Sequence, residues 1–78
     1  MSKDFRIVFT KHAILKLQQR KIRRDWVIKT IMESENITVK NEKYCAFRKF
    51  GTIYLKVVFK RLGGLVIVIT QHFVRFKK

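Results

Sequence analysis

The spacing of apolar and polar residues changes once along this chain, near residue 36. Before that point, apolar residues recur at intervals of three and four, which is the period of an amphipathic helix. After it, they alternate with polar residues or form short apolar runs, as they do in strands. Residues 5–9 (Phe-Arg-Ile-Val-Phe) are an exception because they are rich in strand-forming types. The predicted order is therefore one strand, two helices and four further strands.

The two predicted helices are separated by a short break at Ile22. The first is expected from about Lys11 to Lys21, with the hydroxyl of Thr10 as its N-cap. The second is expected from about Arg24 to Glu35. The residues expected on the buried faces of these helices are Ala13, Ile14, Leu17, Val27, Ile28, Ile31 and Met32.

The second half of the chain reads as a meander. Strands are expected at residues 37–40, 44–50, 52–61 and 65 to about 73, separated by turns at 41–42, 51 and 62–64. Phe47 is expected in the core. The pattern predicts a single α+β domain over residues 1–78, in which two N-terminal helices pack on one face of an antiparallel sheet of about four strands. A basic C-terminal tail is expected over residues 73–78.

The last hairpin admits two registers, which place His72 differently. A three-residue loop pairs Arg61 with Leu65 and leaves His72 on the face opposite the core, together with Tyr54, Lys56, Lys60 and Thr70. A two-residue Gly-Gly turn shifts the pairing by one residue and moves His72 toward the core. We favour the first register because it gathers the largest aliphatic side chains on one face.

Length and composition exclude several classes of protein. A chain of 78 residues forms one small domain. Its single cysteine, Cys45, cannot form an intramolecular disulfide, which argues against a small secreted protein stabilised by disulfides. Its longest wholly apolar run has five residues, far fewer than the ~20 that span a bilayer. Since the N-terminus also lacks the hydrophobic region of a signal peptide, we expect a cytoplasmic protein without a membrane partner.

The charge is strongly positive and unevenly placed. The formal net charge is +14, from 19 Lys and Arg against five Asp and Glu, although 47% of the residues are hydrophobic. Four of the acids lie between residues 25 and 42, whereas residues 5–24 and 43–78 contain no acid. A folded chain with this charge is expected to bind a polyanion, with RNA favoured over DNA. A generally cationic, solvated surface is the alternative.

Several residues are candidates for the chemistry of such a partner. Histidine titrates near neutral pH, so His12 and His72 are candidate proton-transfer groups for RNA cleavage through the 2′-hydroxyl. The candidates for binding phosphate are Lys16, Arg20, Arg23, Arg48, Lys49, Lys56 and Arg75.

Spacing supports some of these assignments and leaves alternatives. His12, Lys16, Arg20 and Arg23 fall within about a quarter of the helical circumference, as a phosphate-binding strip or an ordinary solvated helix face would. Lysine and arginine residues interleave with aromatic residues in 44–50 and 73–78. This pattern is typical of surfaces that bind single-stranded nucleic acid. The alternative for His72 is an ordinary polar residue at the point where a buried strand emerges into water. The acids form no plausible metal-binding pair, so neither a metal nor another cofactor is expected.

A family resemblance rests on short motifs. The chain resembles a small family of uncharacterised domains at Phe9-Thr10-Lys11-His12-Ala13, Leu17, Arg20, Ile22, Asp25-Trp26-Val27 and Val68-Ile69-Thr70. In that family the first helix begins His-Ala and an Arg follows seven residues after the Ala. Over roughly residues 7–73 the order of elements is similar to that of RelE-like and BrnT-like toxins of toxin–antitoxin pairs.

The resemblance implies a metal-independent endoribonuclease of the RelE-like fold, either ribosome-dependent or free, that an acidic antitoxin-like protein neutralises. It places His12, Arg20 and Thr70 at signature positions, whereas His72 matches no strict motif. Arg23 stands where the family usually has a Ser or Thr helix cap. Two readings without catalysis stay open, because fold does not settle function. One is an RNA- or DNA-binding protein, including a homodimer formed at an exposed sheet edge, and the other is a module whose basic face meets only an acidic protein.

Overall fold

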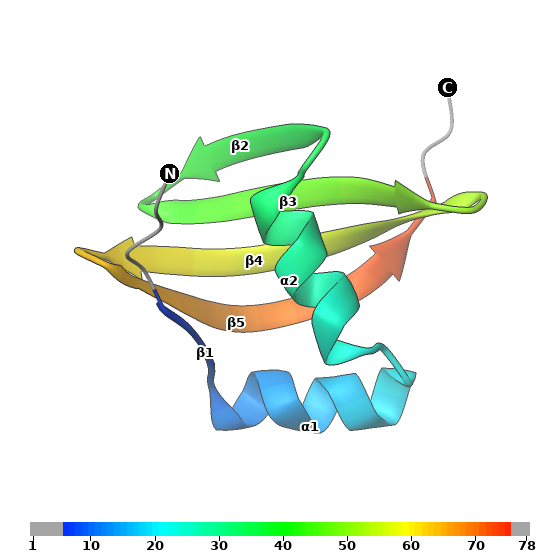
Figure 1. Ribbon diagram of the computed structural model, residues 1–78, viewed down its shortest axis with the longest axis horizontal. Helices are drawn as coiled ribbons and strands as arrows, with labels where there is room; N and C mark the ends of the chain where they lie inside the picture. The colour runs from blue at the N-terminus through cyan, green and yellow to red at the C-terminus, as the bar shows by residue number, and fades with distance from the viewer. Residues whose placement is uncertain (1–5, 76–78) are drawn as a thin grey trace.

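The computed structural model describes residues 6–75, which form two helices and a five-stranded mixed sheet (Figure 1). The strand order is β1-β5-β4-β3-β2, with β1 parallel to β5 and the other pairs antiparallel. The α+β class and the order of elements are confirmed, but the sheet has five strands rather than about four, because the first strand joins it beside the last. The elements are β1 (Arg6–Phe9), α1 (Lys11–Arg20), α2 (Arg24–Met32), β2 (Asn36–Lys40), β3 (Lys43–Phe50), β4 (Ile53–Leu62) and β5 (Leu65–Val74).

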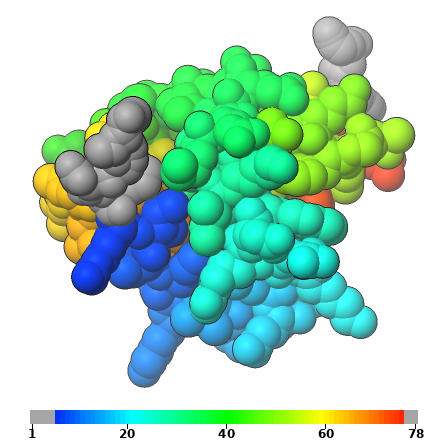
Figure 2. All heavy atoms as spheres, viewed as in Figure 1, coloured from blue at the N-terminus to red at the C-terminus, as the bar shows by residue number. Residues whose placement is uncertain are grey.

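Both helices pack on one face of the sheet, which we call the covered face. Helix α1 runs beside β5, and α2 crosses in front of β3 and β4; both lie toward the viewer in Figures 1 and 2. The side chains that form the core between the layers are Ala13, Leu17, Ile22, Val27, Ala46, Leu55, Val57, Phe59, Val66 and Val68. The opposite face of the sheet carries neither helix, so it meets solvent.

The helix ends follow local chemistry in one case and not in the other. The Thr10 hydroxyl accepts a 3.0 Å hydrogen bond from the Ala13 main-chain N–H, which confirms the expected cap. Arg23 is the N-cap of α2 and makes no side-chain capping bond. Helix α2 stops at Met32, three residues earlier than expected, because Glu33 leaves the helical conformation (φ −129°, ψ 44°). Met32 is consequently 54% exposed and not buried.

The β4–β5 hairpin turns through two glycines, so the favoured three-residue loop is wrong. Leu62 pairs with Leu65 across Gly63-Gly64, and Gly63 has a positive φ of 58° that glycine adopts without strain. This register turns Val66 and Val68 toward the core, where both are buried, in place of the larger Leu65, Ile67 and Ile69 that alternate with them. The volume of the aliphatic side chains therefore did not decide the register.

A β-bulge then changes which residues of β5 face each side. Phe59 pairs with Val68 but Val58 pairs with Thr70, which leaves Ile69 as the extra residue. Beyond the bulge, His72 pairs with Lys56. His72 thus lies on the face opposite the core, as expected, but the bulge places it there and not the loop length.

Candidate nucleic-acid interface

The face of the sheet without helices carries basic, aromatic and aliphatic side chains, and we call it the uncovered face. Ala46, Val57 and Gln71 are fully buried on the other side, so alternation assigns the outward positions. In β3, β4 and β5 these are Lys43, Cys45, Phe47, Lys49, Tyr54, Lys56, Val58, Lys60, Leu62, Leu65, Ile67, Thr70, His72 and Val74. None of the three strands contains an acid, so within them nothing offsets the lysine charges.

An aromatic side chain lies at the centre of this face. Phe47 pairs with Lys56, whose Nζ is 5.9 Å from the centroid of the Phe47 ring. Phe47 is half-buried and was expected in the helix-covered core, but strand alternation turns it to the other side because its neighbour Ala46 fills the core position. A ring beside a lysine suits a nucleobase with its phosphate.

His72 stands between two cations at one end of the uncovered face. Lys56 is its cross-strand partner, and Arg20 approaches from α1. Partial burial, and then the positive charges of Lys56 and Arg20, hold the pKa of His72 below its usual 6.5. A shallow pocket lined by Arg20, His72 and Phe73 opens at this point. These surroundings favour the neutral imidazole, which is flanked by groups that attract phosphate.

Arg20 is held in place by the main chain of β5. Its Nη1 donates a 2.8 Å hydrogen bond to the Gln71 carbonyl oxygen. The Gln71 side chain is fully buried, and its Nε2 donates a 2.9 Å hydrogen bond to the Ala13 carbonyl oxygen, which ties α1 to the same strand. Gln71 was not singled out from the sequence as a site residue. Its only sequence signal is a polar residue between the apolar run of β5 and His72.

The other two predicted members of the strip on α1 lie apart from this cluster. His12 is exposed on the first turn, and it makes no hydrogen bond or ion pair within residues 6–75. Lys16 donates from Nζ to Gln19 Oε1 at 3.2 Å, on the helix itself. Helical periodicity thus aligns His12 and Lys16 with Arg20, but of the three Arg20 alone perturbs His72.

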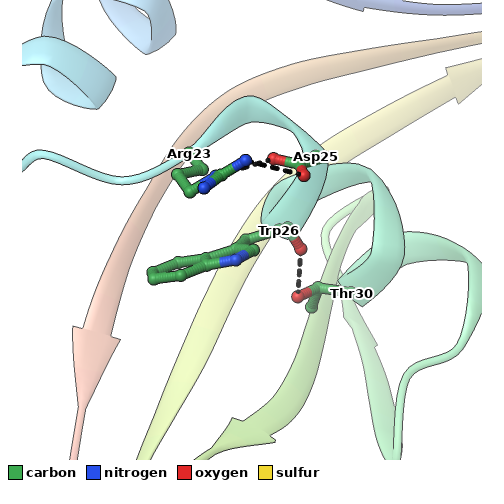
Figure 3. A network of polar contacts seen from close by, with 4 residues as sticks. All are labelled: Arg23, Asp25, Trp26 and Thr30. Atoms are coloured by element: carbon green, nitrogen blue, oxygen red, sulfur yellow. Dashed lines mark hydrogen bonds and ion pairs between the residues drawn. The ribbon is translucent and has the colours of Figure 1, made fainter.

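Arg23 lies beside α2 and not at the His72 cluster. Figure 3 shows its guanidinium turned to the carboxylate of Asp25, with Nε 3.3 Å from Oδ1. In the same view the Thr30 hydroxyl donates a 2.8 Å hydrogen bond to the Trp26 carbonyl oxygen one turn further along. Because Asp25 offsets its charge, Arg23 contributes less to attracting an anion than an unpaired arginine does.

Arg48 and Lys49 were both assigned to phosphate, yet adjacent strand positions face opposite sides. Arg48 is on the covered face, where Nη1 donates to the Glu33 carbonyl oxygen at 3.2 Å and lies 3.8 Å from Glu33 Oε1. Its guanidinium carbon lies 5.6 Å from the centre of the Phe50 ring. Lys49 is exposed on the uncovered face opposite Tyr54. The structure therefore groups Lys49 with Lys56 and separates Arg48 from them.

The end of the chain is described only in part. Phe73 and Val74, expected in the basic tail, belong to β5, and Arg75 follows them as an exposed residue. Residues 76–78 of the expected tail lie outside the described residues.

Other kinds of site find little support in the described chain. Across residues 6–75, His, Cys, Asp and Glu side chains do not gather in a group of three that could hold a metal ion. No helix in this part of the chain is long and apolar enough to cross a membrane. No protein-family model matches the sequence, and neither a curated protein nor a solved structure matches it significantly. The RelE-like resemblance therefore rests on the sequence motifs alone.

Proposed function

We propose that this protein binds single-stranded RNA on the uncovered face and cleaves it at His72 without a metal ion. The observation that carries the proposal is the meeting of Arg20, Lys56 and His72 at β5, beside a face whose strands contain no acidic residue. The resemblance to RelE-like toxins supports it at one residue, since Arg20 is both a signature position and a member of this cluster.

The proposed reaction uses the neutral imidazole as a general base. Because the pKa of His72 is lowered by burial and by Lys56 and Arg20, its ring is ready to take the proton of a ribose 2′-hydroxyl at pH 7. The 2′-oxygen then attacks the adjacent phosphorus, and the bond to the 5′-oxygen breaks to leave a 2′,3′-cyclic phosphate. Lys56 and Arg20 stabilise the additional negative charge on the phosphorane. The leaving 5′-oxygen takes up a proton from water, because His12, the donor expected from the sequence, lies apart from this cluster.

Binding is proposed to extend away from this cluster along β3 and β4. Phe47 offers a ring for stacking a base, and Lys49 and Lys56 neutralise the neighbouring phosphates. Single-stranded RNA is favoured over a duplex because stacking on a side chain needs an unpaired base.

The test is cleavage of end-labelled single-stranded RNA in the presence of EDTA, with mass spectrometry of the product ends. His72→Gln is expected to slow cleavage about 10²–10⁴-fold and to leave RNA affinity nearly unchanged, since a general base contributes to the rate and not to binding. A DNA strand of the same sequence should be bound but not cut, because it lacks the 2′-hydroxyl. His12→Gln is the matched variant for the second histidine. Wild-type rates in His72→Gln, or equal cutting of DNA, would contradict the proposed mechanism.

Non-catalytic binding on the same face is the second candidate. It is favoured by the presence of one histidine, not two, among the groups gathered at Lys56 and Arg20. On this reading the purified protein binds RNA in a salt-sensitive manner and leaves it intact. An acidic antitoxin-like protein that shields the uncovered face stays a prediction, and it would displace RNA from either form.

A further inference from the structure

Among the described residues, 6–75, no strand pairs with the outer edge of β2. β2 is the last strand in the order and all five of its residues are exposed. Figures 1 and 2 show it along the upper margin of the molecule, away from α1. Its two large apolar side chains, Ile37 and Val39, are 47% and 58% exposed. An exposed strand with apolar side chains is a template for pairing with another strand.

The main chain of β2 is oriented for such pairing. The β2–β3 hairpin has a two-residue turn, Asn41-Glu42, with φ of 51° and 66°. In a hairpin of this kind the flanking pair, Lys40 and Lys43, is the hydrogen-bonded one, and such pairs then alternate along the ladder. The main-chain groups of Ile37 and Val39 therefore point away from β3, toward the free edge.

The local charge is unlike that of the rest of the molecule. Residues 33–43 contain three of the five acids of the chain and two lysines, for a net charge of −1, whereas the whole chain carries +14. Two copies of so basic a protein repel each other over most of their surfaces. At the β2 edge that repulsion is reduced.

We propose that two copies of this chain associate through antiparallel pairing of their β2 strands, about a two-fold axis at Thr38. This register places Ile37 beside the partner's Val39 and Val39 beside the partner's Ile37, which reduces the exposure of all four apolar side chains to water. It also brings Glu35, at the start of the strand, near the partner's Lys40 at its end. A two-fold axis at Ile37 or at Val39 would instead set one apolar residue against Glu35 or Asn41.

A pocket beside β2 extends the apolar surface available to the partner. It has a volume of about 300 Å³ on the covered side of the sheet, and it is lined by Ile31, Met32, Ile37, Tyr44, Phe59, Arg61 and Val66. Met32, left exposed by the early end of α2, lies at this pocket next to Ile37. Because the two-fold axis is perpendicular to the sheet, the two uncovered faces lie on the same side of the paired sheets.

The mass of the protein in solution tests this association. Nucleic-acid-free protein in high salt is expected at twice its 9.4 kDa by sedimentation equilibrium. Val39→Lys should weaken association at least roughly tenfold, because each lysine is placed among apolar side chains at the axis. Leu15→Lys is the matched control, since Leu15 is 50% exposed on α1, far from β2 in Figure 1, and its change should leave the mass unchanged.

Disulfide trapping tests the register. Thr38 pairs with Cys45 within one copy, so the experiment uses Thr38→Cys in a Cys45→Ala background. At the axis two cysteines meet at the separation that a disulfide needs, and oxidation should give a covalent dimer. Lys40→Cys in the same background is the control, because its equivalent on the other copy lies several residues away.

A monomeric mass at all concentrations, or association that Val39→Lys does not weaken, would overturn the proposal. If the protein is a monomer that binds an acidic peptide, and if Val39→Lys abolishes that binding, the β2 edge binds a different protein and the proposed dimer is wrong. The proposed ribonuclease activity does not depend on the outcome, since Val39 is not at the His72 cluster.

Discussion

The two faces of the sheet are built from the same strands, yet one holds the molecule together and the other carries its charge. In β4, Leu55 and Val57 are fully buried beneath the helices, while Lys56 between them faces outward next to Phe47 and His72. In β3, Arg48 points inward to Glu33 and its neighbour Lys49 points outward. Because adjacent residues of a strand face opposite sides of the sheet, one residue contributes to stability and its neighbour to binding. Substitutions at adjacent positions can therefore test the two properties separately.

The largest effect is expected on the covered face. Leu55→Ala should lower the free energy of unfolding by about 2–5 kcal/mol, because it removes a fully buried side chain and leaves a cavity. Urea denaturation measures the loss. The adjacent Lys56→Ala is the matched control and should change stability far less. Equal losses from the two variants would show that the faces are not divided as described.

The next effect is on RNA affinity. Phe47→Leu should weaken binding of single-stranded RNA by about 1–3 kcal/mol, since it removes a ring on which a base stacks. Phe50→Leu is the control, because Phe50 stacks on Trp26 on the covered face, with ring centroids 5.4 Å apart. Phe50→Leu should lower stability and spare affinity, and fluorescence anisotropy at fixed salt compares the two. Similar affinities for both variants would place RNA elsewhere.

A smaller effect is expected from a single phosphate contact. Lys49→Gln should reduce the slope of log affinity against log salt by about 0.7, which corresponds to one neutralised phosphate of a single strand. Arg23→Gln should change the slope less, because Arg23 is already paired with Asp25. Titrations at several salt concentrations provide the slopes. A steeper loss for Arg23→Gln would move the interface toward α2.

The smallest effect is electrostatic. NMR titration should give His72 a pKa below 6.5, and Lys56→Gln should raise it toward 6.5 by removing one of the two cations. Because the pKa of His72 is lower in the folded than in the unfolded chain, its contribution to stability is complete above about pH 6.5. That contribution is lost as the pH falls through the folded pKa. Lys49→Gln is the control, and a pKa of His72 above 6.5 would contradict the described surroundings.

Local features of the fold could be predicted from the sequence. The Thr10 cap depends on residues within one turn, and the change of period near residue 36 separates helices from strands. The end of α2 at Met32 could not, because helical periodicity continues to Glu35 without a stop signal. The pairing of β1 with β5 could not be predicted either, because residues 6–9 do not indicate which strand, nearly sixty residues away, they pair with.

The sequence indicated which residues are candidates for the site better than it indicated which of them lie together. Periodicity aligned His12 with Arg20 on one helix, but which of them meets His72 depends on how α1 is tied to β5 through Gln71. The face on which His72 lies depends on the bulge at Ile69, which no residue type signals. The separation of Arg48 from Lys49, by contrast, follows from strand alternation alone.

The unequal edges of the sheet have a consequence for how far the protein can assemble. Beyond the short strand β1, helix α1 lies along β5, and Arg20 occupies the Gln71 carbonyl that a further strand would need. A fibre that grows strand by strand requires two receptive edges on every copy. Because the other edge offers a further strand only the four residues of β1, growth through β2 is expected to end after a single addition, so the chain can use an exposed apolar strand without polymerising.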